Sequence, residues 1–132
     1  MITAVDTSVL IKILKREDDA PSAMSALELA ANQGTLLVSA IVVAELGRLF
    51  KTNQLLLSFL SDMQLLISPI TDACALQAAD IMRSYAKNKG DRSRIAADFL
   101  IGAHAMTHAN QLLTTDAGFM RQYFATLKVV NP

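Results

Sequence analysis

The feature that most constrains the fold of this chain is a regular alternation of short apolar runs with helical patterns. Each apolar run has the length of a strand. It is followed by a segment whose apolar residues are spaced three or four apart, which indicates a helix. Strands that alternate with helices imply right-handed crossovers and a parallel sheet covered by helices on both faces. The predicted strands are residues 1–5, 36–38, 65–67, 112–114 and 129–130.

The segments between these strands carry the predicted helices, and the composition favours one domain. A chain of 132 residues has the length of an ordinary domain, and a hydrophobic content of 52% is enough for a sizeable core. We therefore predict that residues 1–132 form a single α/β domain with about five short strands. The predicted helices are residues 7–15, 19–32, 39–50, 53–61, 71–90 and 91–109, with a short helix around Phe119 and Met120.

Charge and cysteine content narrow the possible functions. The net charge is zero, so any contact with nucleic acid must come from a local basic patch. Cys74 is the only cysteine, which excludes an internal disulfide and fits a reducing cytoplasm. No apolar run approaches the ~18 residues of a membrane span, and the N-terminus lacks the pattern of a signal peptide. We therefore expect a cytoplasmic protein that does not interact with membranes.

Two of the apolar runs end in an acid that precedes a helix. Asp6 follows the first strand in Asp6-Thr7-Ser8, and Asp116 follows the fourth in Thr114-Thr115-Asp116. Ligands of open parallel sheets bind outside the carboxyl ends of the strands, so both acids are site candidates. If strands one and four are neighbours, the two acids face each other across the switch point of a doubly wound sheet. The alternative is that each carboxylate caps the helix that follows it.

Two further acids lie on helix faces that are otherwise apolar. Glu45 shares a face with Ile41, Val42 and Leu49, and Asp98 lies among small and apolar residues of its own helix. A lone buried carboxylate is costly unless it is paired, protonated or bound to a metal. The alternatives are ion pairs one turn away, Glu45 with Arg48 and Asp98 with Arg94.

Four carboxylates that converge on one crevice would repel strongly unless a cation lay between them. Hard oxygen ligands favour Mg²⁺ or Mn²⁺. His104 and His108 also have a metal-ligand spacing, but they project away from Asp98 on the helical wheel, and we do not expect them to join the acids.

Four blocks of the sequence resemble the motifs of the PIN domain family, whose small single-domain members are the VapC-type toxins of bacterial and archaeal toxin–antitoxin pairs. The resemblance extends over the whole chain in length, order and spacing. The blocks are Asp6-Thr7-Ser8 after an apolar strand, Ala44-Glu45-Leu46, Asp98-Phe99-Leu100-Ile101-Gly102-Ala103 and Thr114-Thr115-Asp116-Ala117-Gly118-Phe119.

This resemblance implies a metal-dependent ribonuclease that hydrolyses phosphodiester bonds in single-stranded RNA and is inhibited by a cognate antitoxin. Thr115 departs from a form of the last motif that has Asn at this position. The resemblance and the surplus of Leu, Met and Phe together predict a homodimer that forms through residues 53–63. The implied site consists of the acids Asp6, Glu45, Asp98 and Asp116, which would bind the metal, with Thr7 and Thr115 as accessory polar residues.

An acidic crevice can bind RNA only if a basic rim holds the phosphates. The alternative is that these cations are simply solvated helix ends. The candidates are Lys12, Lys15, Arg48, Lys87, Lys89, Arg92 and Arg94.

Two other functions compete with the nuclease prediction. A phospho-accepting receiver domain is a five-stranded α/β fold with an Asp–Mg²⁺ pocket, but it needs its acceptor acid after the third strand, where this chain has Ser68-Pro69. The second is a catalytically inactive PIN-like module that binds RNA or a protein. Retention of all four acids favours activity over this reading.

Overall fold

Five parallel strands form the sheet, in the order β3-β2-β1-β4-β5. The computed structural model describes residues 1–88 and 94–132. The predicted parallel sheet is confirmed, and the strand bounds differ from the predicted ones by one residue. The strands are β1 (Ile2–Val5), β2 (Thr35–Ser39), β3 (Leu65–Ser68), β4 (Gln111–Leu113) and β5 (Lys128–Val130).

The helices lie between the strands as predicted, but three are shorter than expected. The helix predicted for residues 71–90 ends at Lys87, and the one predicted for residues 91–109 begins at Ala96. The helix predicted for residues 39–50 ends at Gly47, and Leu49 and Phe50 then donate backbone hydrogen bonds to Leu46 and Gly47 in a tighter turn. The helix boundary predicted at Gly90 and Asp91 lies outside the described residues. The helices are α1 (Thr7–Leu14), α2 (Ala20–Gln33), α3 (Ala40–Gly47), α4 (Asn53–Asp62), α5 (Asp72–Lys87), α6 (Ala96–His108) and α7 (Ala117–Tyr123).

The order in which strands are added to the sheet changes direction at the central strand β1. It pairs on one side with β2 and on the other with β4, which comes much later in the chain. The register places Val5 opposite Leu113, and the Asp6 N–H continues the ladder with a 3.0 Å hydrogen bond to the Leu113 carbonyl. The carboxyl ends of β1 and β4 therefore lie side by side, as expected for a switch point.

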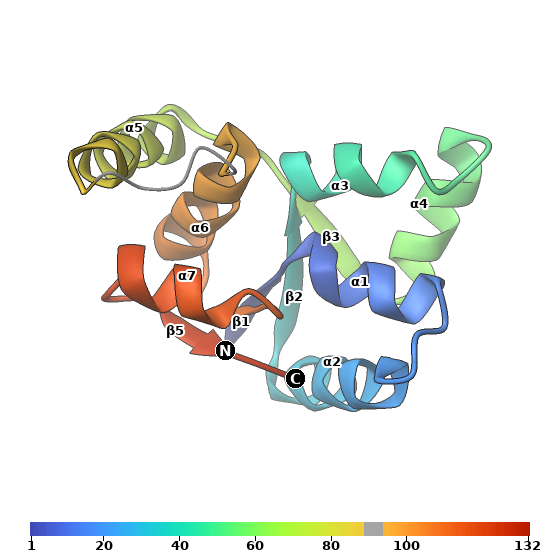
Figure 1. Cartoon of the computed structure of the whole chain (residues 1–132). Coiled ribbons are helices and arrows are strands. Elements are labelled where there is room, and N and C mark those ends of the chain that lie inside the picture. Colours follow the sequence, from blue (N-terminus) through green and yellow to red (C-terminus); the bar gives the residue numbers. More distant parts are fainter. Residues whose placement is uncertain (89–93) are drawn as a thin grey trace.

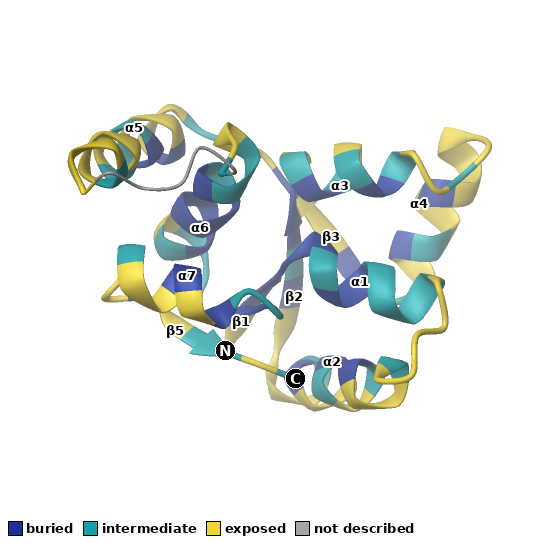
Figure 2. Ribbon diagram, viewed as in Figure 1, coloured by how far each residue is buried: buried dark blue, intermediate teal, exposed yellow. Residues whose placement is uncertain are grey.

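Helices cover both faces of this sheet. In Figure 1, α5, α6 and α7 lie to the left of the central strands, and α1, α2 and α4 lie to the right. Figure 2 shows that the inner faces of these helices and the central strands are buried, whereas the outer faces are exposed. In the described part of the chain, no helix is both long and apolar enough to cross a membrane.

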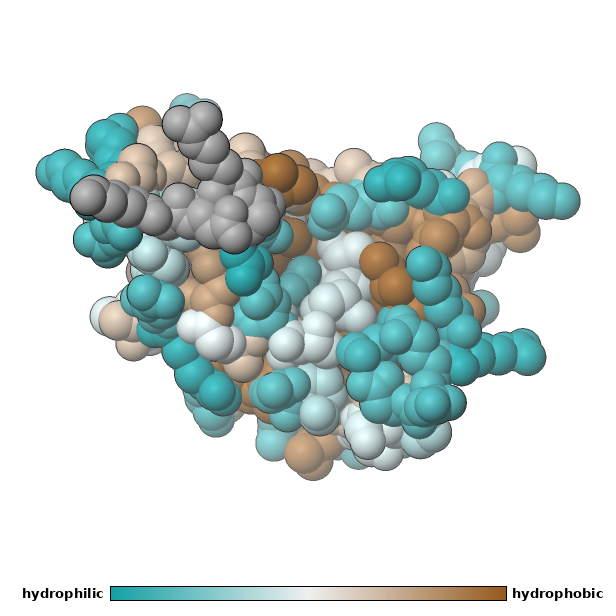
Figure 3. Space-filling view, in the orientation of Figure 1, coloured by the Kyte–Doolittle hydropathy of each residue, from teal (hydrophilic) through white to brown (hydrophobic). Residues whose placement is uncertain are grey.

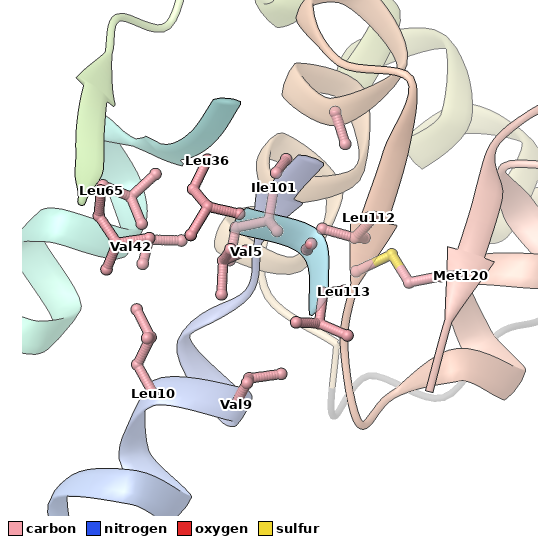
Figure 4. Packing of buried hydrophobic residues seen from close by; sticks show 14 of the residues in the cluster. Val5, Val9, Leu10, Leu36, Val42, Leu65, Ile101, Leu112, Leu113 and Met120 are labelled. Carbon is pink, nitrogen blue, oxygen red and sulfur yellow. The ribbon is translucent and has the colours of Figure 1, made fainter. Parts of the chain in front are cut away.

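The core fills the space between the central strands and the helices. Figure 4 shows Val5, Leu36 and Leu113 of the strands packed with Leu10 of α1 and Ile101 of α6. Burial of each such aliphatic side chain contributes about 1.5–3 kcal/mol to stability. This packing holds the carboxyl ends of β1 and β4 rigidly together.

One helix approaches its neighbour closely because it has a glycine at the contact. A Cβ atom at Gly102 of α6 would lie 2.5 Å from the ring of Phe124, which is only 1% exposed. The missing side chain therefore lets α6 pack against the segment that follows α7. This contact fixes α6, which carries Asp98.

Candidate active site

Asp6 occupies the position at which β1 ends and α1 begins, yet its carboxylate makes no side-chain cap hydrogen bond to α1. The residue is only 7% exposed. Asp6 Oδ2 accepts hydrogen bonds from the Thr114 hydroxyl (2.6 Å) and the Ser8 hydroxyl (3.2 Å). Burial raises the pKa of Asp6, the hydrogen bonds from Thr114 and Ser8 oppose the rise, and the nearby Glu45 carboxylate adds to it. Asp6 is thus a buried carboxylate held by neutral donors.

Glu45 projects from α3 towards the start of α1. Its Oε1 accepts a 2.7 Å hydrogen bond from the Thr7 hydroxyl. The alternative pair with Arg48 is not formed, since among the described residues no arginine or lysine nitrogen lies within 4.0 Å of the Glu45 carboxylate. Thr7 therefore connects Glu45 to the strand end that carries Asp6.

Asp98 and Asp116 share a different partner, the guanidinium of Arg94. Arg94 donates to both oxygens of Asp116, through Nη1 to Oδ2 and through Nη2 to Oδ1 at 3.1 Å. Its Nη1 lies 3.9 Å from Asp98 Oδ2, so the predicted pair one turn away is present but is the weaker of the two. Asp98 also accepts a 3.3 Å hydrogen bond from the Ile95 N–H at the start of α6. The hydrogen bond and charge of Asp116 raise the pKa of Arg94, so this arginine stays charged.

Thr114 connects these two groups of acids. Its hydroxyl is fully buried, donates to Asp6 at 2.6 Å and accepts from the Asp116 N–H at 2.9 Å. Ser8 forms a second connection, because its hydroxyl donates to Asp6 and accepts from the Thr115 N–H at 3.2 Å. Neither Thr114 nor Ser8 was among the predicted site residues. Each stands two positions from a candidate acid, and that spacing is the signal that could have identified them.

A family model for the PIN domain matches residues 3–125 of the chain. The chain belongs to the PIN domain family. A search of curated proteins gave no match. The suspected resemblance is therefore confirmed at the level of the family.

Solved structures support the same assignment. FitAcB from Neisseria gonorrhoeae is 31% identical, with a TM-score of 0.67, and the match covers 100% of this chain and 98% of that chain. VapBC2 from Rickettsia felis, bound to a DNA fragment from the promoter, has a TM-score of 0.79 at 24% identity and covers 100% and 99%. VapBC-1 from nontypeable Haemophilus influenzae has a TM-score of 0.75 at 17% identity and covers 99% and 98%.

The PIN domain places its four candidate acids in two halves. Asp6 and Glu45 interact with hydroxyls, whereas Asp98 and Asp116 interact with Arg94. Over residues 1–88 and 94–132, no three His, Cys, Asp or Glu side chains are arranged closely enough to hold a metal ion. The donor chemistry nevertheless fits Mg²⁺ or Mn²⁺, because all four groups are carboxylates. The half with Asp6 has no cation of its own within the described residues.

A groove beside Glu45 brings two of the predicted rim cations to the acids. Lys15 and Arg48 line it together with Thr7, Ile11 and Leu49, and its volume is about 280 Å³. Figure 3 shows residues of intermediate hydropathy in the middle of the face seen in Figure 1, with hydrophilic side chains and a smaller hydrophobic patch beside them. The lining residues give the groove charged side chains, Lys15, Arg48 and Glu45, and apolar ones, Ile11 and Leu49.

The remaining predicted rim cations are placed differently. Lys12 pairs with Asp19 at 2.6 Å, and Lys87 lies in the last turn of α5. Lys89 and Arg92 lie outside the described residues. Thr115, the second predicted accessory residue, lines a separate cavity of about 250 Å³ with Lys12 and the C-terminal Asn131 and Pro132.

The two histidines lie apart from the acids, on the part of α6 that faces β3 and the start of α5. His104 is 1% exposed and its Nε2 lies 2.8 Å from the Ser68 hydroxyl, whereas His108 Nε2 lies 3.3 Å from the Thr71 hydroxyl. Burial lowers the pKa of His104 to about 4, and the neighbouring His108 contributes to this shift. A buried neutral imidazole bonded to a serine fits a packing role.

Proposed function

We propose that this PIN domain is a metal-dependent endoribonuclease that cleaves single-stranded RNA and is the toxin of a toxin–antitoxin pair. The observation that carries the proposal is the position of Asp6. It is a buried carboxylate at the switch point, held by neutral hydroxyls beside Glu45 and linked through Thr114 to Asp116. PIN domains are generally nucleases, and this arrangement retains the acids on which such an activity depends.

The carboxylates of Asp6, Glu45, Asp98 and Asp116 would hold the metal. Bound Mg²⁺ or Mn²⁺ lowers the pKa of a coordinated water and stabilises the leaving oxygen of a phosphodiester. The chain contributes the orientation of the acids. The hydroxyls of Thr114 and Ser8 fix Asp6, and Thr7 fixes Glu45, so these carboxylates need little reorganisation before the reaction.

The groove beside Glu45 supports RNA as the substrate. Lys15 and Arg48 would bind backbone phosphates, and the apolar side chains of Ile11 and Leu49 would lie against a base. Neither cation has a carboxylate within 4.0 Å in the described part of the chain, so both are free to bind phosphate. A single strand fits better than a duplex because its bases are accessible.

The structural neighbours support a partner protein, since several of them are VapBC or FitAB complexes. We propose that a cognate antitoxin blocks the site with an Arg or Lys side chain, which can replace the metal among the carboxylates. A structure of an inhibited complex in which no partner residue approaches Asp6 or Asp98 would exclude this mode of inhibition.

We also propose that the protein is cytoplasmic and forms a homodimer. Leu55 and Leu57 of α4 are 52% and 53% exposed, and Leu66 and Ile67 on the neighbouring edge strand β3 are 57% and 50% exposed. This apolar surface includes the exposed side of the predicted segment 53–63, whose Leu56 and Leu60 are buried in the core. A monomer mass by light scattering at micromolar concentration would contradict the proposed homodimer.

One observation favours a second candidate function, a catalytically inactive module that binds RNA or a protein. Arg94 already neutralises part of the charge of Asp98 and Asp116 without a metal. An inactive module would keep this ion pair permanently and would not need divalent ions for binding.

Cleavage of single-stranded RNA by the purified chain separates the two functions. We expect cleavage with Mg²⁺ or Mn²⁺, none in EDTA, and a loss on the order of 100-fold or more in Asp6→Asn and Asp98→Asn. The matched control is Asp80→Asn, because Asp80 pairs with Arg83 on the exposed surface of α5 and the variant removes the same charge. Undiminished cleavage in EDTA, or equal losses in all three variants, would disprove the nuclease proposal.

A further inference from the structure

Arg94 binds the acids of one half of the site in a specific geometry. Both oxygens of Asp116 accept from its guanidinium, and Asp98 Oδ2 lies 3.9 Å from Nη1. The guanidinium carbon also lies 4.0 Å from the centroid of the Phe119 ring in α7, a cation–π arrangement. Side-chain exposures of 28% for Arg94, 31% for Asp98 and 34% for Asp116 show that the cluster is accessible at the surface.

This geometry uses the same oxygens that a metal would need. A planar guanidinium that binds both carboxylate oxygens leaves Asp116 with little capacity for a further cation. A divalent ion at Asp116 would therefore have to share a carboxylate oxygen with the guanidinium or displace one of the two hydrogen bonds. It would also meet the positive charge of Arg94 at close range, where like charges repel.

The other half of the site differs in this respect. Asp6 and Glu45 accept hydrogen bonds from the hydroxyls of Thr114, Ser8 and Thr7, which carry no charge and do not repel a metal. The site is therefore asymmetric, with one half open to a cation and the other half already neutralised by an internal one.

We propose that Arg94 is an internal counter-ion that competes with the divalent metal for Asp116 and Asp98. Metal binding requires the guanidinium to leave Asp116, and this step lowers the metal affinity of the site. In the metal-free protein the same contact keeps the two acids from repelling each other. The inference rests on the proposed metal site and concerns how that site is controlled.

The test measures Mn²⁺ binding to the full chain, by the electron paramagnetic resonance signal of free Mn²⁺, for the wild type and two charge-matched variants. Arg94→Gln removes the competing cation, whereas Arg83→Gln removes a cation that pairs with Asp80 on the exposed face of α5. We expect Arg94→Gln to bind Mn²⁺ about tenfold more tightly, equivalent to about 1.4 kcal/mol. Arg83→Gln should bind as the wild type does.

Thermal melts provide a second readout that does not depend on activity. In EDTA, Arg94→Gln should melt at a lower temperature than Arg83→Gln, because Asp98 and Asp116 lose their counter-ion. Saturating Mn²⁺ should then raise its melting temperature more than that of the wild type, since ligand binding stabilises the fold in proportion to affinity. If Arg94→Gln does not fold, Arg94→Lys replaces it, because a lysine keeps the charge but cannot bind both oxygens in the same way.

The outcomes distinguish this inference from the proposed function. If the wild type binds Mn²⁺ and the Arg94 variant binds it equally or more weakly, the competition is disproved while the metal site stands. If neither protein binds Mn²⁺, the metal site itself fails and the inference fails with it. Tighter binding in the Arg94 variant alone, with the Arg83 control unchanged, supports the competition.

Discussion

A buried neutral histidine makes the stability of this PIN domain depend on pH. His104 is 1% exposed, and its ring bonds to the Ser68 hydroxyl at 2.8 Å in the contact between α6 and β3. The perturbation is His104→Gln, because a glutamine amide can still bond to Ser68 but does not take up a proton in this range. The variant should therefore keep the contact and lose the pH dependence.

The magnitude follows from the pKa of His104, which burial lowers from 6.5 to about 4. Between these two values the unfolded chain binds more protons than the folded one, so the free energy of unfolding falls as the pH falls. The contribution is fully present above pH 6.5 and is lost progressively down to about pH 4. One pKa unit is worth about 1.36 kcal/mol, so the full loss is about 3 kcal/mol.

Urea unfolding of the wild type and of His104→Gln measures how the free energy of unfolding of each protein changes with pH. The range from about pH 7.5 to about pH 4.5 covers the titration of histidine. The wild type should lose about 2.5 kcal/mol more than His104→Gln over this range. His108→Gln serves as the control and should retain most of the loss, because burial is the larger cause of the His104 shift and His108 the smaller one. Equal pH profiles for the wild type and His104→Gln would refute the reasoning.

Two further predictions concern packing and the buried acid. Gly102→Ala should destabilise the fold by about 1–2 kcal/mol, because its Cβ would lie 2.5 Å from the Phe124 ring and the gain in helix propensity does not offset the overpacking. A Cβ atom at Gly118 would have no atom within 4 Å, so Gly118→Ala should stabilise α7 by about 0.5–1 kcal/mol. Equal melting temperatures of Gly102→Ala and Gly118→Ala would contradict this account of the packing. Asp6→Asn should be at least as stable as the wild type at neutral pH in EDTA, since burial raises the pKa of Asp6 and disfavours its charge. Saturating Mg²⁺ should stabilise the wild type but not Asp6→Asn. Thermal melts in which Asp6→Asn is less stable than the wild type in EDTA would contradict this prediction.

The order of strands and helices could be predicted from the sequence for a physical reason. Strands buried on both faces form short, mostly apolar runs, and amphipathic helices repeat their apolar residues every three or four positions. The segment after Gly47 shows the limit of this approach. Its apolar residues continue the helical pattern, but the backbone turns there, and Leu49 is 43% exposed. Periodicity alone does not reveal where the backbone leaves the helical path.

The partners of the acids could not be predicted in the same way. Arg94 precedes Asp98 by one turn, and sequence spacing favours that pair, yet its main partner is Asp116, 22 residues away. The choice depends on how α6 and α7 meet, with the Phe119 ring placed beneath the guanidinium. No local sequence pattern predicts the distance between Arg94 and Asp116. It depends on the packing of α6 against the end of α7, where Gly102 approaches Phe124 closely.

The site is determined more by the register of two strands than by any single acid. Val5 pairs with Leu113, so the next residues along, Asp6 and Thr114, meet at the carboxyl end and form the 2.6 Å hydrogen bond that joins the two halves. A shift of one residue would turn Thr114 to the opposite face of the sheet and leave the buried Asp6 without its closest donor. Because β1 and β4 are far apart in sequence, only the complete fold can set this register. The alignment that buries Val5 and Leu113 in the core therefore also links Asp6 to the Asp116 N–H through a single hydroxyl group, that of Thr114.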